Sequence, residues 1–202
     1  MLFRSGYSAR ALLIPGGGSE GGRSPPPSAL TLSAWRRVMA ASGVLAGLLW
    51  ACAAPGRMAG AEFVVPAKGY RVVPPPGWRR IPSDADLALR DDPRRAGLLV
   101  HGSCEGPAPR RPLSVLARHL RFGLRDLRDL SERPVEVAGQ AAVRTEFLAR
   151  LDDAPVAVKA VTLQARGCAY DLIVVAPPDA VAQAADDFER LVASFRLVEP
   201  GR

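Results

Sequence analysis

Cysteine and histidine are the side chains of this sequence with the most distinctive chemistry, and the chain has few of them. The cysteines and histidines are Cys52, Cys104, Cys168, His101 and His119. A thiol can carry a lipid, form a disulfide or bind a metal, and an imidazole can bind a metal or transfer a proton. Which of these applies depends on the compartment in which the chain folds, and the residues before the first cysteine indicate that compartment.

A weakly polar stretch with the length of a signal-peptide core precedes the first cysteine. Residues 38–51 contain no charged side chain and follow the pair Arg36-Arg37. Such a stretch is typical of a secretory signal and is shorter than the roughly 18 apolar residues of a membrane span. We therefore expect export by the general secretory route. Residues 1–37 are expected to be a disordered tail or upstream sequence included by a wrong start codon.

Residues 49–52, Leu-Trp-Ala-Cys, resemble a bacterial lipobox, in which the cysteine receives a diacylglycerol before the preceding peptide bond is cut. The Leu and Ala positions match, whereas Trp50 is bulkier than the small residue usual there. The resemblance implies that acyl chains on Cys52 hold the mature chain on a membrane, each buried methylene contributing about 0.8 kcal/mol. The alternative is cleavage at Ala59-Gly60-Ala61, which would release a soluble periplasmic protein.

Cys104 and Cys168 are the two thiols that remain once Cys52 is assigned to the anchor. Oxidising compartments favour the pairing of thiols, so we expect a disulfide between them. It would close a loop of about 64 residues and contribute roughly 4 kcal/mol in the chain-entropy model. Two buried free thiols and a redox-active pair stay open as alternatives, although no Cys-x-x-Cys motif is present.

The histidines do not complete a metal or catalytic motif in the sequence. His101 and Cys104 fall on opposite faces of an expected strand, and there is no second Cys-His cluster, so we expect no metal and no other cofactor. Ser103, a histidine and Asp171 could form a hydrolase triad in a cleft near Trp78, but no nucleophile elbow accompanies them. We expect no enzyme activity and keep a soluble periplasmic ligand-binding protein or small hydrolase as the alternative.

Arginines crowd an expected helix in the middle of the chain. A candidate lipid- or partner-binding face on it consists of Arg118, Arg121, Phe122, Arg125 and Arg128. One interpretation is a solvated face, since Asp126 and Asp129 interrupt the arginines. The sharper hypothesis is a docking face for anionic lipid headgroups or an acidic partner, with the aromatic ring as an apolar contact.

The composition is that of a globular protein. The chain has 202 residues, of which 48% are hydrophobic and 23% charged, with a net charge of +7. These values exclude a wholly disordered chain and a protein with several membrane spans. Residues 1–51 hold five arginines and one glutamate, so the remainder carries a net charge of only +3. Because aromatic residues are not interleaved with the basic ones, we expect no nucleic-acid partner.

The hydrophobic periods place these residues on an α+β fold. Residues 52–68 are rich in Ala, Pro and Gly and indicate a flexible tether, and residues 69–199 form the domain. Leucines spaced three and four apart predict a helix over 112–130, and a second helix follows Pro177-Pro178. Strands are expected at 70–73, 85–90, 96–104, 131–137, 141–149, 156–165 and 168–175, the last three as an antiparallel meander. The predicted fold is an antiparallel β-sheet of about six or seven strands covered by two helices.

The order of these features resembles that of the PsbP-like superfamily. The resemblance rests on Tyr70 followed by Pro-Pro-Gly-Trp78, a helix after the third strand, a three-strand meander and a closing segment from Phe188 to Phe195. This superfamily includes a photosystem II accessory protein, a Ran-binding nuclear import factor and many bacterial lipoproteins. The resemblance implies an α/β/α sandwich over about residues 69–197 and a non-catalytic role, and it implies no site residue.

Together these observations predict an exported, lipid-anchored accessory or binding domain of the bacterial cell envelope. The N-terminal lipid would attach it to the inner or outer membrane, and we expect an envelope protein as its partner.

Overall fold

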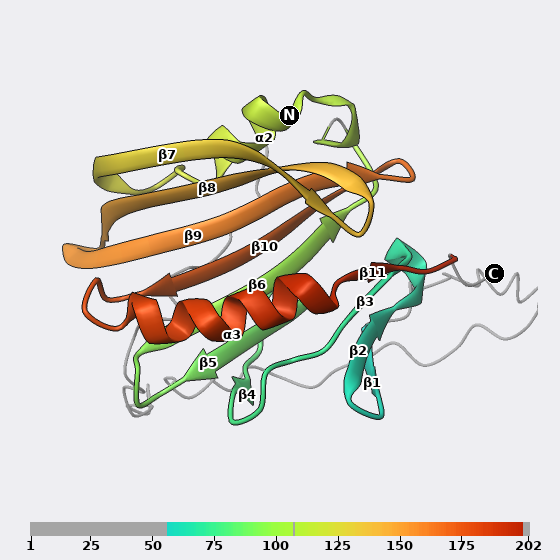
Figure 1. Cartoon of the computed structure of the whole chain (residues 1–202), viewed down its shortest axis with the longest axis horizontal. Helices are drawn as coiled ribbons and strands as arrows, with labels where there is room; N and C mark the ends of the chain where they lie inside the picture. The colour runs from blue at the N-terminus through green and yellow to red at the C-terminus, as the bar shows by residue number, and fades with distance from the viewer. Residues whose placement is uncertain (1–55, 107, 200–202) are drawn as a thin grey trace, which may run out of the picture. The chain divides into compact units, whose positions relative to one another are not determined.

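The computed structural model describes residues 56–106 and 108–199, and the expected export segment and Cys52 lie outside them. The described chain forms two antiparallel sheets (Figure 1). The larger has seven strands, in the spatial order β4 (Arg79–Arg80), β5 (Leu87–Asp91), β6 (Ala96–Ser103), β10 (Cys168–Ala176), β9 (Ala154–Ala165), β8 (Gln140–Leu151) and β7 (Arg125–Val137). With two α-helices packed on it, this sheet confirms the predicted α+β class.

Three consecutive tight hairpins build half of the large sheet. The turns between β7, β8, β9 and β10 are Ala138-Gly139, Asp152-Asp153 and Arg166-Gly167, and all six residues have positive φ angles. Two-residue turns of this kind match the right-handed twist of the strands that they join. The predicted three-strand meander is therefore confirmed, and β7 extends it by one strand.

The smaller sheet begins earlier in the chain than the sequence suggested. Its strands are β1 (Arg57–Ala59), β2 (Glu62–Val65), β3 (Tyr70–Val72) and β11 (Arg196–Leu197), with a 3-10 turn, η1 (Pro66–Lys68), between β2 and β3. The prediction of a flexible tether is therefore wrong for residues 57–68. The reason is that β2 pairs with β3 and buries Phe63 and Val65, which outweighs the Ala, Gly and Pro around them.

Helix α3 (Val181–Ser194) confirms the second predicted helix and lies across one face of the large sheet (Figure 1). Its buried side chains include Phe188 and Leu191. Below it, the rings of Tyr70, Tyr170 and Phe195 contact one another at centroid distances of 5.4 to 5.5 Å. This aromatic cluster forms the centre of the main core.

Helix α2 (Leu113–His119), which follows the 3-10 turn η2 (Ala108–Arg110), is much shorter than the helix predicted over 112–130. The chain turns at Gly123, whose φ of 82° is left-handed, and Arg125 then begins β7. Leu120 and Leu124 pack against the sheet, whereas Leu127 and Leu130 lie largely exposed on β7. Pairing with β8 at Arg125 and Arg128 holds residues 125–130 in the sheet, and this overrides their helical period.

Strand β7 is bulged where it runs along the free edge of the large sheet. Between Arg125, Arg128 and Ser131 it advances three residues at a time, while β8 advances two. Asp126 and Asp129 take up the extra length in left-handed backbone, each with a φ of 52°. The repeated sequence Arg-Asp-Leu therefore forms two β-bulges in succession.

The two faces of the large sheet bury separate cores. The core under α3 includes the aromatic cluster and Trp78. The core on the other face is smaller and mainly aliphatic, with Phe147 as its one aromatic side chain, and Leu120 and Leu124 pack against it. Within the described residues, no helix combines the length and apolar character that a membrane crossing requires.

Candidate functional site

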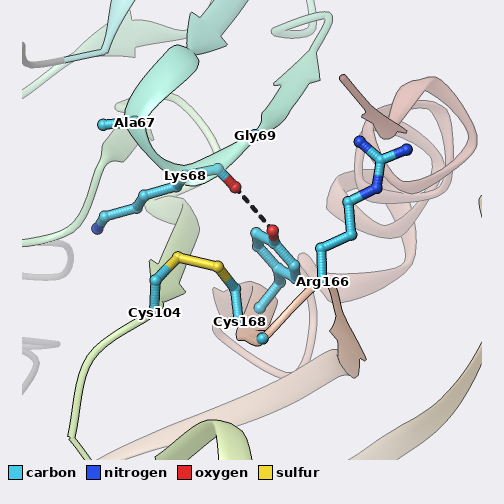
Figure 2. Close-up of a pocket in the computed structure, with 8 residues that line it drawn as sticks. Ala67, Lys68, Gly69, Cys104, Arg166 and Cys168 are labelled. Atoms are coloured by element: carbon cyan, nitrogen blue, oxygen red, sulfur yellow. Dashed lines mark hydrogen bonds between the residues drawn. A yellow bond between two sulfur atoms is a disulfide. The ribbon is translucent and has the colours of Figure 1, made fainter. Parts of the chain in front are cut away.

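A cavity of about 230 Å³ lies where η1 meets the end of β6 and the turn between β9 and β10. Its lining residues are Ala67, Lys68, Gly69, Cys104, Arg166, Gly167, Cys168 and Tyr170. Figure 2 shows the disulfide between Cys104 and Cys168 at this cavity. The side chains of Lys68 and Arg166 extend away from it to opposite sides. The sequence did not single out Lys68 or Arg166.

Two turns position the cations of this cavity. Gly69 ends η1 in left-handed backbone, with a φ of 64°, and its N–H donates to the carbonyl of Pro66 at 3.1 Å. A residue with a Cβ would be strained there, so glycine lets the chain reverse directly after Lys68. On the opposite side, the Arg166-Gly167 turn places the arginine at the edge of the cavity.

The disulfide between Cys104 and Cys168 confirms the pairing predicted from the sequence. Cys104 directly follows β6 and Cys168 begins β10, and these strands are neighbours in the sheet. The bond joins residues 64 apart in the sequence. It therefore closes the long loop that contains α2, β7, β8 and β9.

The carboxylate of Asp86 neutralises the ammonium group of Lys68 and accepts hydrogen bonds from three donors. Lys68 Nζ lies 2.5 Å from Asp86 Oδ1. The other oxygen, Oδ2, accepts from the Tyr70 hydroxyl at 2.9 Å and from the Gly102 N–H at 2.7 Å. Burial, together with the charge of Asp86, raises the pKa of Tyr70, so this phenol stays a neutral donor.

The second cation and the phenol of the cavity are also engaged. Arg166 donates to the carbonyl of Val198 at 2.8 Å and lies 3.3 Å from the carboxylate of Glu199. Tyr170 donates to the carbonyl of Lys68 at 2.7 Å (Figure 2), and burial raises its pKa. The lining residues include no carboxylate and no histidine. The cavity can therefore hold a small polar group but has no proton-transfer pair among the side chains that line it.

The residues of the hydrolase alternative lie on the α2 side of the sheet. His101 on β6 is directly opposite Asp171 on β10, and Ser103 is opposite Ala169. Two residues along a strand span about 6.6 Å, so Ser103 is a full repeat away from the His101–Asp171 pair. The hydroxyl of Thr162 donates to Asp171 at 2.7 Å.

Burial is the main cause of the pKa shifts of both Asp171 and His101. It raises the pKa of Asp171 to about 6, although the hydrogen bond from Thr162 and the nearby His119 favour the charged form. Burial also lowers the pKa of His101, with Asp86 opposing this effect and Lys68 adding to it. Near neutral pH both shifts reduce the charge that this part of the sheet carries.

The expected cleft near Trp78 and Asp171 does not exist, because these residues lie on opposite faces of the sheet. Trp78 belongs to the core under α3, where its Nε1 donates to Asp187 at 3.0 Å. Asp171 alternates with Tyr170, whose side chain lies in that core, and therefore points to the α2 side. This prediction was wrong because strand alternation separates the two side chains.

Among the described residues, Asp187 is the most deeply buried of four buried charged residues that the sequence did not single out, the others being Arg90, Asp91 and Arg144. It accepts from Trp78 and, at 2.7 Å, from Arg94, and it also pairs with Arg190. Its own burial raises its pKa, but these donors outweigh that effect and hold the pKa below the ordinary value. The available signal was its position three residues after Ala184, on the apolar stripe of α3.

The candidate face of four arginines and Phe122 is not a helix face. Arg118 lies on α2, Arg121 and Phe122 lie in the turn after it, and Arg125 and Arg128 lie on β7. Two of the arginines are engaged: Arg121 pairs with Glu132, and Arg125 lies 2.6 Å from Asp153. The prediction of one helical face is wrong because the helix ends at His119.

Metal ligands are not grouped in the part of the chain that the structure describes: no cluster of three or more His, Cys, Asp or Glu side chains could hold an ion there.

No protein-family model matches the sequence, and no curated protein matches it. Among solved structures, the chain is similar to cyanobacterial PsbP of Synechocystis, with 18% identity and a TM-score of 0.49 over 64% of this chain and 87% of that one. It is similar to LpqN, described as involved in cell envelope biogenesis of Mycobacterium tuberculosis, with 16% identity and a TM-score of 0.49 over 64% and 83% of the two chains.

A protein from Bacteroides thetaiotaomicron gives a TM-score of 0.52 at 11% identity over 72% of this chain, which spans about half (51%) of that protein. At such identities the likeness is one of fold. The strands and helices described above are what place this chain in the α+β class.

Proposed function

We propose that this chain is an exported, lipid-anchored and non-catalytic accessory or binding domain of the bacterial cell envelope, with a domain of the PsbP-like superfamily. The observation that carries the proposal is the disulfide between Cys104 and Cys168. Structural disulfides persist in oxidising compartments and are rare in the cytosol. A bond that joins the end of β6 to the start of β10 fits a chain that matures outside the cytoplasm, in agreement with the export segment at residues 38–51.

A lipid anchor at Cys52 would be joined to the folded domain by only a few residues, because β1 begins at Arg57. An extended chain spans at most about 3.6 Å per residue. The five steps from Cys52 to Arg57 therefore reach at most about 18 Å. Lipidation at Cys52 would hold the folded domain close to the membrane surface, where it can act on a membrane-associated partner.

The geometry favours this role over the ligand-binding or hydrolase alternative. The cavity beside the disulfide, at about 230 Å³, is smaller than the roughly 300 Å³ at which pockets for drug-sized ligands begin. Ser103 is displaced along β6 from the His101–Asp171 pair. A nucleophile acts through a base within hydrogen-bond reach, so this displacement along the strand supports a non-catalytic role.

Palmitate labelling in the native cells tests the anchor. We expect the wild type to incorporate label, Cys52→Ser to lose it, and the Cys104→Ser/Cys168→Ser double variant to keep it, because the internal cysteines are bonded to each other. Absence of label on the wild type would contradict the lipid anchor.

Export is tested separately, because a soluble periplasmic product would also carry the disulfide. The chain is alkylated in intact cells, denatured and treated with a thiol-reactive polyethylene glycol, with and without reductant. We expect a two-thiol shift only after reduction in the wild type, and no shift in the double variant. No shift after reduction would mean that both thiols were free in the cell and had been blocked by the alkylating agent, and it would overturn the export proposal.

A further inference from the structure

Exposed apolar side chains are concentrated where α2 passes into β7. Among the described residues, three of the five exposed large hydrophobic side chains fall within residues 122–130: Phe122, Leu127 and Leu130. Phe122 is 92% exposed, more than any of the others. An aromatic ring left almost wholly in water costs hydration free energy, and such rings often mark a contact surface.

The tip that carries Phe122 is held in place rather than loose. Backbone hydrogen bonds run from Phe122 N to the carbonyl of His119 at 3.1 Å and from Leu124 N to the carbonyl of Arg121 at 3.1 Å. On either side of the ring, Leu120 and Leu124 pack against the core of the α2 face. The fold therefore presents the ring outward on a fixed turn.

Arginines outnumber acidic residues on either side of this tip in the sequence. Residues 110–130 contain six arginines and two acidic residues, Asp126 and Asp129. Arg121 and Arg125 have carboxylate partners. Four further arginines are exposed and make no ion pair with any described residue: Arg110, Arg111, Arg118 and Arg128. Guanidinium groups bind phosphate well because their fork of donors matches phosphate oxygens.

We propose that residues 110–130 form a docking surface for an anionic phospholipid bilayer, with Phe122 entering the headgroup region and the unpaired arginines binding lipid phosphates. Charge complementarity favours this occupant, since a bilayer surface rich in phosphatidylglycerol is a plane of phosphates. A single aromatic ring on a basic, convex turn fits such an interface, where aromatic residues lie at headgroup level. The acyl anchor is not required for this contact, so the two proposals can fail independently.

The test is co-sedimentation with vesicles, using residues 52–202 with Cys52→Ala, which is the mature chain without its acyl anchor and without the apolar segment 38–51. The vesicles are phosphatidylcholine alone or with 30 mol% phosphatidylglycerol. We expect binding to the anionic vesicles that falls at high salt. Each arginine near an anionic surface changes the partition coefficient about fivefold, so Arg118→Glu/Arg128→Glu should lower it by more than tenfold. Neither arginine makes an ion pair in the described structure, so the fold should tolerate both changes.

The ring is tested by Phe122→Ser, which should lower partitioning severalfold, while Phe122→Trp should retain it and shift its fluorescence to the blue on anionic vesicles. The matched control is Arg57→Glu/Met58→Ser, which changes one exposed charge and one exposed apolar side chain on β1. It should bind as well as the parent. Equal partitioning of the parent, Phe122→Ser and Arg118→Glu/Arg128→Glu overturns the proposal, as does a parent that binds neither vesicle, which would instead leave an acidic protein as the partner.

Discussion

The two faces of the large sheet are covered in different ways. On one face, the fourteen residues of α3 lie over a core of large aromatic side chains, and a buried carboxylate links the helix to the turn before β4. On the other face, the seven residues of α2 cover a smaller aliphatic core, next to a carboxyl group whose pKa burial raises. The comparison indicates that the α3 face supplies most of the stability, while the α2 face supplies the exposed side chains available to a partner.

Removing one large buried side chain from each face tests this division most directly. Phe188 under α3 is fully buried, and Phe188→Ala should lower the free energy of unfolding by about 3–5 kcal/mol. Leu116 on α2 is 8% exposed, and Leu116→Ala should cost about 2 kcal/mol, at the low end for such changes. Urea unfolding followed by circular dichroism measures both. Equal costs would mean that the two faces contribute alike.

The disulfide ties the two regions together, because the loop that it closes contains α2 and β7 to β9. Cys104→Ser/Cys168→Ser should lower the free energy of unfolding by about 4 kcal/mol, since the unfolded chain regains the freedom of that loop. Thermal unfolding with and without reductant is the measurement. Reductant should destabilise the wild type by a similar amount and leave the double variant unchanged.

The link between α3 and the turn before β4 rests on Asp187. Asp187→Ala should cost about 2–3 kcal/mol, because it leaves the buried N–H of Trp78 without an acceptor and the guanidinium of Arg94 with Asp91 as its remaining carboxylate. The matched control is Asp186→Ala, an exposed neighbour on the same helix, which should change stability by less than about 0.5 kcal/mol. Chemical denaturation of both variants at neutral pH decides whether the buried carboxylate stabilises the α3 face.

Asp171, the buried carboxyl group of the α2 face, should lower the stability of the fold at neutral pH, whereas Asp187 should raise it. The pKa of Asp171 in the folded chain is about 6, above the ordinary value of 3.8, so the folded state holds this proton more tightly. Its contribution is therefore favourable below about pH 4 and is lost as the pH rises towards 6. Asp171→Asn keeps an oxygen that accepts from Thr162 and should stabilise the chain by about 1–2 kcal/mol at pH 8.

The pH dependence of Asp171→Asn provides its own control. The gain should shrink as the pH falls through 6 and vanish only below about pH 3, where the wild-type carboxyl is protonated in both states. Melting temperatures of both proteins from pH 4 to pH 8 measure the effect. A constant difference across that range would show that the charge on Asp171 is not its cause.

The two faces also differ in how far the sequence predicted them. The stripe from Ala184 to Phe195 predicted α3 correctly, because its apolar side chains pack into the core as their helical spacing requires. Two-residue turns such as Asp152-Asp153 and Arg166-Gly167 likewise fixed the meander. The disulfide followed from compartment and cysteine count. These predictions depended on local patterns that the folded chain keeps.

The failures lie where a distant strand decides the local structure. The leucines from Leu113 to Leu130 are spaced as in a helix, yet residues 125–130 belong to β7 and pair with β8 in the sheet. Phe63 and Val65 gain their burial only by pairing with β3, which a tether-like composition concealed. The cavity joins Lys68 to Arg166 across almost a hundred residues of sequence, and no spacing in the chain indicates that contact.

The bulged edge of β7 has a consequence for how copies of this chain meet one another. A straight, unprotected strand of thirteen residues would be an open template for a foreign strand. Here two bulges within residues 125–131 disrupt the regular spacing of the backbone amides and carbonyls along the edge. Pro134, also on β7, has no N–H to donate. An incoming strand could pair with this edge over only a few residues. The bulges therefore limit edge-to-edge association between copies of this chain.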